Sequence, residues 1–141
     1  MHDPFNLHRF VEAQRPVYNR VLQELQAGHK RSHWMWFIFP QLHGLGRSDM
    51  AEHFALCGAG EAQAYLLHEL LGPRLEECVG ALLQQDGKTA LEILGHPDDL
   101  KLHSCLTLFA SIAPQHPLFG QALERFFAGE EDARTIFLLG E

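Results

Sequence analysis

Apolar residues recur every three to four positions along almost the whole chain, and this period restricts the fold more than any other feature. Val17, Val21 and Leu25, for example, form one such stripe. A period near 3.6 residues is typical of helices with one buried face, whereas half-buried strands alternate every second residue. The one Asp-Gly pair, at 86–87, lies between helical patterns rather than between alternating runs. The chain is therefore predicted to be all-α.

Capping and breaking residues divide this pattern into about six to eight helices. Ser48 and Asp132 stand where a helix N-terminus is expected, and residues 89–92 read Thr-Ala-Leu-Glu, which fits a capping box. Gly28 closes the stripe that ends at Leu25, as a left-handed C-terminal cap would. Gly-Pro at 72–73 is a further strong break, with proline suited to the first turn of a helix.

Length and composition favour one compact domain over residues 1–141. The chain has 141 residues and is 46% hydrophobic, which is ordinary for a single globular core. No internal repeat or low-complexity linker interrupts it. The three cysteines, Cys57, Cys78 and Cys105, are scattered without CxxC spacing, which favours reduced, buried thiols.

The expected location is the cytoplasm, with no membrane association. The first residues lack the basic-then-apolar order of a signal peptide. No apolar run approaches the roughly 20 residues that a membrane-spanning helix needs. The odd number of cysteines agrees with a reducing compartment.

The charge balance argues against nucleic acid as a partner. Eleven Lys and Arg residues face eighteen Asp and Glu residues, so the formal charge is −7 with neutral histidines. Binding to a phosphate backbone needs a basic face, which an acidic chain does not supply by default. We therefore expect no nucleic-acid partner, while the oligomeric state stays open.

One segment, residues 28–48, departs from the acidic character of the rest. It holds both tryptophans, three of the eleven Lys and Arg residues, and no Asp or Glu. Near its end, a glycine-containing loop runs into the helix that Ser48 is predicted to cap. Cations, loop amides and flat aromatic faces together are what a phosphate-bearing molecule requires.

We therefore predict a pocket around residues 30–48 for a phosphate-bearing small molecule, such as a nucleotide or an ADP-ribose-like ligand. The predicted ligand-binding residues are Lys30, Arg31, Trp34, Trp36, Gln41, Gly44, Gly46, Arg47 and Ser48. His33 is the candidate general acid or base if a reaction takes place there. The sequence itself does not decide whether the chain is an enzyme.

The alternative is a protein–protein interaction module without catalytic activity. In that interpretation the aromatic run 34–39 is core and the basic residues meet an acidic partner. A concave pocket around His33, Trp34 and Arg47 would favour the first interpretation, and a flat exposed patch the second.

No cofactor or metal site is expected. Ten histidines are present, but His29 and His33 form the only pair at helical i,i+4 spacing, with no carboxylate or thiolate beside them. The adjacent Asp98 and Asp99 fit the start of a helix better than an acid–base pair. One of them could also form an ion pair with Lys30 or Arg31.

Three blocks of sequence resemble the bacterial domain-of-unknown-function family eighteen-ten. The first block is Lys30–Gln41 followed by Gly44–Ser48, the second is Pro97–Leu102 with Thr107–Phe109, and the third is Phe126–Glu130 with Asp132–Thr135. The resemblance spans nearly the whole chain, and its first block is highly specific. It implies a compact all-helical, intracellular protein and no established activity.

Members of that family are sometimes labelled calpastatin, but a calpain-inhibitory segment would be disordered and repetitive, and this chain is neither. The chain departs from the family pattern at His103 and Cys105, where arginine and serine are more common. A histidine at 103 would make any anion contact weaker and dependent on pH. The pattern is also faintly similar to a helical family that handles ADP-ribose adducts.

Overall fold

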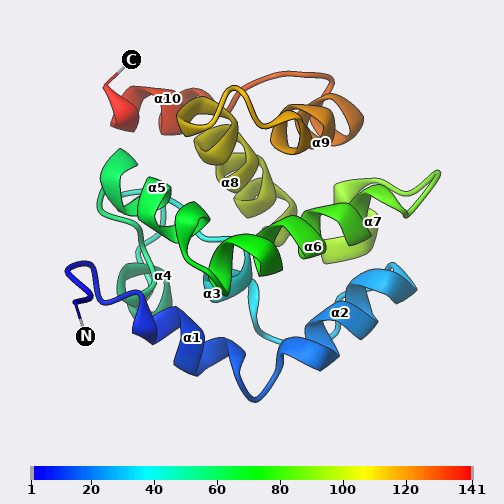
Figure 1. Ribbon diagram of the computed structural model, residues 1–141. Coiled ribbons are helices and arrows are strands. Elements are labelled where there is room, and N and C mark those ends of the chain that lie inside the picture. The colour runs from blue at the N-terminus through cyan, green and yellow to red at the C-terminus, as the bar shows by residue number, and fades with distance from the viewer. Residues whose placement is uncertain (1, 141) are drawn as a thin grey trace.

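Ten helices make up the regular structure of residues 2–140, the part of the chain that the computed structural model describes (Figure 1). They are α1 (His8–Gln14), α2 (Tyr18–Ala27), α3 (Met35–Ile38), α4 (Asp49–His53), α5 (Ala59–Leu67), α6 (Leu71–Leu83), α7 (Ala90–Leu94), α8 (Asp98–Ile112), α9 (Pro117–Phe127) and α10 (Ala133–Leu139). The all-α prediction is confirmed. Three helices, α3, α4 and α7, have only four or five residues, too few to produce a periodic stripe. The predicted six to eight therefore corresponds to the longer helices.

Helix α8 lies at the centre of the array and contacts α5, α7, α9 and α10 (Figure 1). Its central position follows from its sequence, because Leu102 and all six residues 104–109 are buried. A helix that is apolar on every side packs among other helices rather than at the surface. Helix α6 contacts α2, α5 and α9, and thereby joins the two ends of the chain.

The predicted helix ends are found where the sequence placed them. Gly28 ends α2 in the left-handed conformation, with φ of 74°. The Ser48 hydroxyl accepts a hydrogen bond from the Ala51 amide, and residues 89–92 form the capping box. Asp132 caps α10 through the Thr135 amide. Local sequence signals thus set most boundaries.

A buried carboxylate holds the aromatic part of residues 28–48 in the core. Glu24 of α2 accepts hydrogen bonds from the backbone amides of Arg31 and Ser32, at 2.8 and 3.1 Å. It also accepts from the Ser32 hydroxyl and, at 2.9 Å, from the Trp34 indole. Burial opposes ionisation, but these donors outweigh it and lower the pKa of Glu24 to about 2. Trp34 is 1% exposed as a result.

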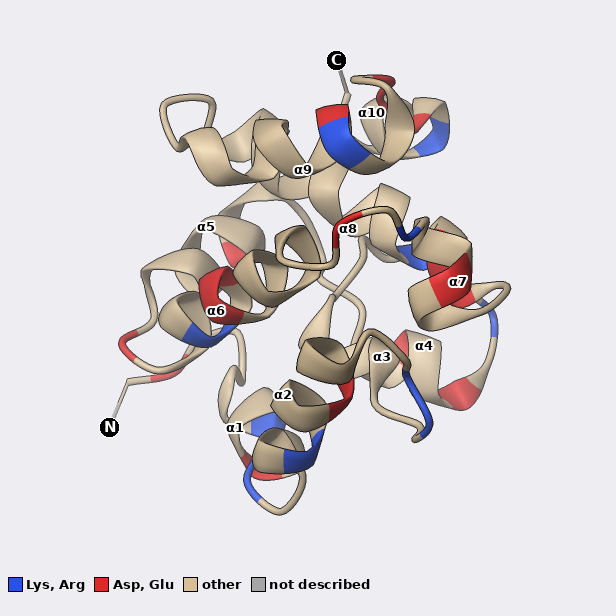
Figure 2. Cartoon of the chain, turned by 90° about the vertical axis from the view of Figure 1, so that its right-hand side faces the viewer, with Lys and Arg blue, Asp and Glu red and all other residues tan. Residues whose placement is uncertain are grey.

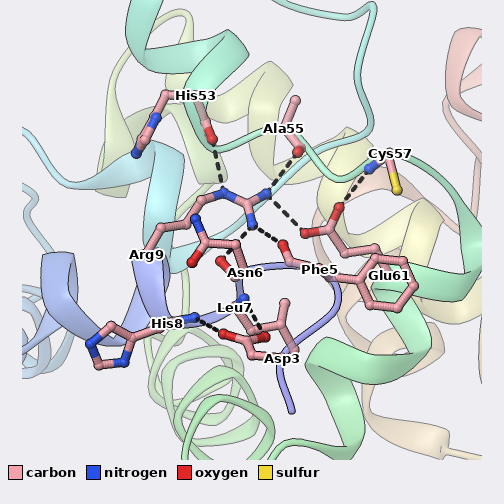
Figure 3. A network of polar contacts seen from close by, with 10 residues as sticks. All are labelled: Asp3, Phe5, Asn6, Leu7, His8, Arg9, His53, Ala55, Cys57 and Glu61. Carbon is pink, nitrogen blue, oxygen red and sulfur yellow. Dashed lines mark hydrogen bonds and ion pairs between the residues drawn. The ribbon is translucent and has the colours of Figure 1, made fainter. Parts of the chain in front are cut away.

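A guanidinium ties the start of the chain to α5 (Figure 3). Arg9 pairs with Glu61 at 2.9 Å, and their side chains are only 12% and 3% exposed. Glu61 in turn accepts the Cys57 amide at 2.8 Å. The remaining donors of Arg9 bond the backbone carbonyls of Phe5, Asn6, His53 and Ala55. One buried ion pair therefore joins three stretches of chain.

Gly72, in the first turn of α6, permits a close backbone approach. A Cβ atom at this position would overlap the carbonyl oxygen of Leu66. Gly72→Ala is expected to lower the free energy of unfolding by about 1–3 kcal/mol, because a backbone atom cannot move aside as a flexible side chain can. Urea unfolding measures this, with Gly80→Ala as the matched control.

Gly80 lies in the same helix, and a Cβ there would meet nothing within 4 Å. Gly80→Ala is expected to stabilise the protein by about 0.5–1 kcal/mol through helix propensity. Equal effects of the two substitutions would show that the contact with Leu66 is unimportant.

None of the helices in residues 2–140 is both long and apolar enough to span a membrane.

The placement of the cysteines agrees only in part with prediction. Cys78 and Cys105 are buried, and burial raises the pKa of both thiols, that of Cys78 to about 12. Cys57 is exposed, contrary to the expectation of a buried thiol, because it lies in the loop before α5.

Candidate functional site

A surface cleft of about 300 Å³ lies between the loop after α3, the first half of α8 and the start of α10. We call it the α8–α10 cleft. Helices α8 and α10 lie against one another in both views of the chain (Figure 1, Figure 2). The cleft is lined by Gln41, Leu45, Gly46, Pro97, Leu100, Lys101, His103, Ser104, Asp132 and Arg134. Polar groups from three distant stretches of sequence therefore meet in one concavity.

Two permanent cations line the cleft. Lys101 lies over the ring of Trp36, with its Nζ 5.3 Å from the ring centroid, and 3.6 Å from Asp98. Arg134 donates to the carbonyl of Gly44 at 3.3 Å. Each of these contacts uses only part of the donors that an ammonium or a guanidinium carries. Both side chains are thus positioned by the fold and still have donors for an anion.

Lys30 does not line this cleft but pairs with the start of α8. Its ammonium lies 2.9 Å from Asp98, and its side chain is 9% exposed. It also lies over the Trp34 ring, 5.0 Å from the centroid. The expected ion pair between this segment and the start of α8 is confirmed. Asp98, placed between Lys30 and Lys101, fixes the aromatic segment against α8.

The carboxylate of the cleft, Asp132, is held by three donors on one oxygen. Its Oδ2 accepts the Ser104 hydroxyl at 3.0 Å, the Thr135 hydroxyl at 2.6 Å and the Thr135 amide at 3.3 Å. Its backbone N–H donates to the Thr107 hydroxyl at 2.9 Å. This set of bonds joins α10 to α8 and fixes the wall of the cleft.

His103 contributes an imidazole ring to the cleft. Its Nε2 lies 2.7 Å from the carbonyl oxygen of Glu130, so this nitrogen carries the proton that the contact requires. The ring stacks on Phe127, with centroids 4.2 Å apart. His103 therefore has a fixed orientation, with Nδ1 as its remaining polar atom.

The structure separates the residues that the sequence grouped as one site. Gln41 and Gly46 line the cleft, and Trp36 and Gly44 contact its two cations. Trp34 lies in the core and Lys30 is paired with Asp98. The remaining predicted residues are exposed and outside the lining of the cleft: Arg31, His33, Arg47 and Ser48.

The glycine loop has a packing role of its own. A Cβ on Gly46 would come within 2.6 Å of the Ala51 side chain, so the loop can pass α4 only because this residue lacks one. Ser48 uses its hydroxyl to cap α4, a helix of five residues. The loop amides are accordingly explained by local structure.

Lys101, Asp132 and Arg134 were missed as site residues by sequence reasoning, although a signal for them existed. Lys101 lies in the second block that resembles the family, and Asp132 and Arg134 lie in the third. The first block contributes Gln41 and Gly46 to the same cleft. Three separate blocks of sequence thus converge on one place, which only the tertiary structure reveals.

Within residues 2–140, no three His, Cys, Asp or Glu side chains form a group that could hold a metal ion. Basic and acidic positions are interspersed in the view of Figure 2, and no side of that view is wholly basic.

These features define an all-helical protein with a small polar cleft on its central helix. The chain belongs to the family described as "Protein of unknown function (DUF1810)", whose pattern matches residues 4–139. It is similar to the conserved hypothetical protein Rv1873 from Mycobacterium tuberculosis, whose crystal structure superposes with a TM-score of 0.97. That similarity covers 99% of both chains at 53% sequence identity. No curated protein matches the chain.

Proposed function

We propose that the protein binds a phosphate-bearing small molecule, such as a nucleotide or an ADP-ribose-like ligand, in the α8–α10 cleft. The observation that carries the proposal is the meeting of Lys101 and Arg134 with the polar groups of Gln41 and His103 in one concavity. Ammonium and guanidinium groups are the usual partners of phosphate oxygens, the guanidinium through paired hydrogen bonds. The site differs from the one first predicted, because Lys30 and Arg47 do not take part.

The size of the cleft agrees with a small ligand. Its volume of about 300 Å³ lies at the lower end of the range for small-molecule sites. The apolar side chains of Leu45, Pro97 and Leu100 provide one wall, against which a ring can pack. Binding alone is proposed. A catalytic role for His33 stays a prediction, since this side chain is exposed and not part of the lining.

The test is a thermal-shift screen with AMP, ADP-ribose and inorganic pyrophosphate on wild type, Arg134→Ala and Arg20→Ala. A ligand present at one hundred times its dissociation constant stabilises the folded state by about 2.7 kcal/mol. We expect that stabilisation for wild type and Arg20→Ala, and its loss in Arg134→Ala. Arg20 is the matched control because it is an exposed arginine on α2, away from the cleft.

Two results would contradict the proposal. One is the absence of any shift of wild type with all three compounds. The other is an equal shift in wild type and Arg134→Ala, which would place the ligand elsewhere. Arg47→Ala serves as a further comparison, since Arg47 belongs to the site predicted from the sequence but does not line the cleft.

The alternative function, an interaction module without catalytic activity, has one observation in its favour. Phe137 and Leu138 of α10 are 81% and 42% exposed, so two neighbouring large apolar side chains lie at the surface. Phe137→Ser should abolish binding to a protein partner and leave the phosphate-dependent shift intact. If Phe137→Ser instead lost the phosphate-dependent thermal shift, the exposed side chains of α10 and the cleft would belong to one site.

A further inference from the structure

The α8–α10 cleft carries a carboxylate beside its cations, and a site for phosphate alone would not. We propose that the ligand bears hydroxyl groups next to its phosphate, as pentose phosphates and ribonucleotides do, and that Asp132 accepts those hydroxyls. This inference rests on the proposed function, because it assigns a ligand group to the part of the same cleft that lies beside Asp132.

Asp132 cannot turn away from the cleft without losing its own contacts. Its Oδ2 accepts three hydrogen bonds, from the two polar groups of Thr135 and from the hydroxyl of Ser104. Its backbone is bonded to the Thr107 side chain on α8. The carboxylate is therefore a fixed feature of the wall rather than a mobile surface group.

The second oxygen, Oδ1, accepts no hydrogen bond from any group in residues 2–140. A carboxylate oxygen can accept two hydrogen bonds, so Asp132, which lines the cleft, retains an unused acceptor. A phosphate placed there would be repelled by the negative charge. The part of the ligand beside Asp132 must therefore supply donors.

The charge of the neighbouring side chains decides which kind of donor fits. An ammonium or guanidinium group on the ligand would satisfy Asp132, but Lys101 and Arg134 line the same small cleft and oppose a cation. Neutral hydroxyl groups donate to Asp132 without that repulsion. A molecule with phosphate at one end and hydroxyls at the other matches both halves of the cleft.

The volume and the apolar wall of the cleft narrow the class of ligand further. At about 300 Å³, the cleft is small for a ligand with two linked nucleotides. Leu45, Pro97 and Leu100 offer one apolar wall for the face of a sugar ring or a base. A single pentose phosphate unit, free or as part of a mononucleotide, is the class that these dimensions favour.

The test is titration calorimetry of wild type, Asp132→Asn and Arg134→Ala with ribose 5-phosphate and with inorganic phosphate. Asparagine keeps the cap of α10 and nearly the same shape. Hydrogen bonds to a charged group are strong enough that their loss should weaken ribose 5-phosphate binding about tenfold or more. Binding of inorganic phosphate should stay unchanged or become tighter, while Arg134→Ala should weaken both.

A measurement on wild type alone keeps the proposal testable if Asp132→Asn fails to fold. Ribose 5-phosphate should bind at least tenfold more tightly than methyl phosphate, which has no hydroxyl group. Equal affinities, or equal losses for ribose 5-phosphate and inorganic phosphate in Asp132→Asn, would overturn the role of Asp132 and leave the phosphate site standing. If wild type binds none of the three compounds, the proposed function fails as well.

Discussion

Arg9→Met is expected to lower the free energy of unfolding by about 3–5 kcal/mol, because it leaves the carboxylate of Glu61 buried without its counter-ion. Glu61 is 3% exposed, and apart from Arg9 it has only uncharged partners, the amide and thiol of Cys57, among residues 2–140. Methionine fills a similar volume but donates no hydrogen bond. The four backbone carbonyls that Arg9 bonds would also lose their donors.

Urea unfolding followed by circular dichroism measures this effect, and Arg15→Met is the matched control. Arg15 lies at the end of the same helix and pairs with Glu12, but both side chains are more than half exposed. An exposed pair of this kind contributes less than about 1 kcal/mol, so the control should change little. Similar losses in the two variants would mean that the Arg9–Glu61 pair is no more important than a surface pair.

The double variant Arg9→Met, Glu61→Met distinguishes the effect of an unpaired buried charge from the effect of losing the backbone contacts of Arg9. Removing both charges takes away the uncompensated carboxylate, so much of the lost stability should return. A double variant as unstable as the sum of the two single ones would contradict this account. In that case the backbone contacts of Arg9, rather than its charge, would hold the N-terminal segment.

Much of the fold could be predicted because its signals are local. The capping box at residues 89–92, the hydroxyl cap of Ser48 and the left-handed Gly28 depend on a few neighbouring residues, and all are present. The short helix α3 escaped prediction for the opposite reason. It has too few residues for a period to appear, and tertiary packing rather than propensity stabilises it.

The site was harder to predict, because its residues come together only through tertiary packing. The unusual composition of residues 28–48 drew attention to Lys30 and Trp34, yet both interact with the protein itself, through Asp98 and Glu24. Nothing local in the sequence links Gln41 to Arg134, which lie more than ninety positions apart. The blocks that resemble the family contained both residues but gave no indication that they meet.

One carboxylate explains why the aromatic segment became core rather than a ligand platform. Glu24→Gln is expected to destabilise the protein by about 3 kcal/mol at neutral pH. The four donors around Glu24 lower its pKa from 4.5 to about 2. A pKa lowered this far means that the folded state favours the ionised form by about 3 kcal/mol. Glutamine accepts these bonds more weakly and brings a second donor among them.

The dependence on pH has a definite sign. Because the folded state lowers the pKa, the stabilisation from Glu24 is fully present above about pH 4.5 and is lost as the pH falls from there toward 2. The difference in stability between wild type and Glu24→Gln should therefore shrink over this range. Backbone hydrogen bonds also lower the pKa of Asp3 and Glu92, so the comparison of variants, not the wild-type curve alone, isolates Glu24.

Tryptophan fluorescence during urea unfolding is a suitable measurement, since both tryptophans of the chain lie in the segment that Glu24 holds. Glu12→Gln is the matched control, because this side chain is 51% exposed on α1 and should contribute little. If the difference between wild type and Glu24→Gln stayed constant down to pH 2.5, folding would not lower the pKa of Glu24, and its ionised form would add no stability. The ion pair of Lys30 with Asp98 and apolar packing would then hold the segment that joins α2 to the cleft.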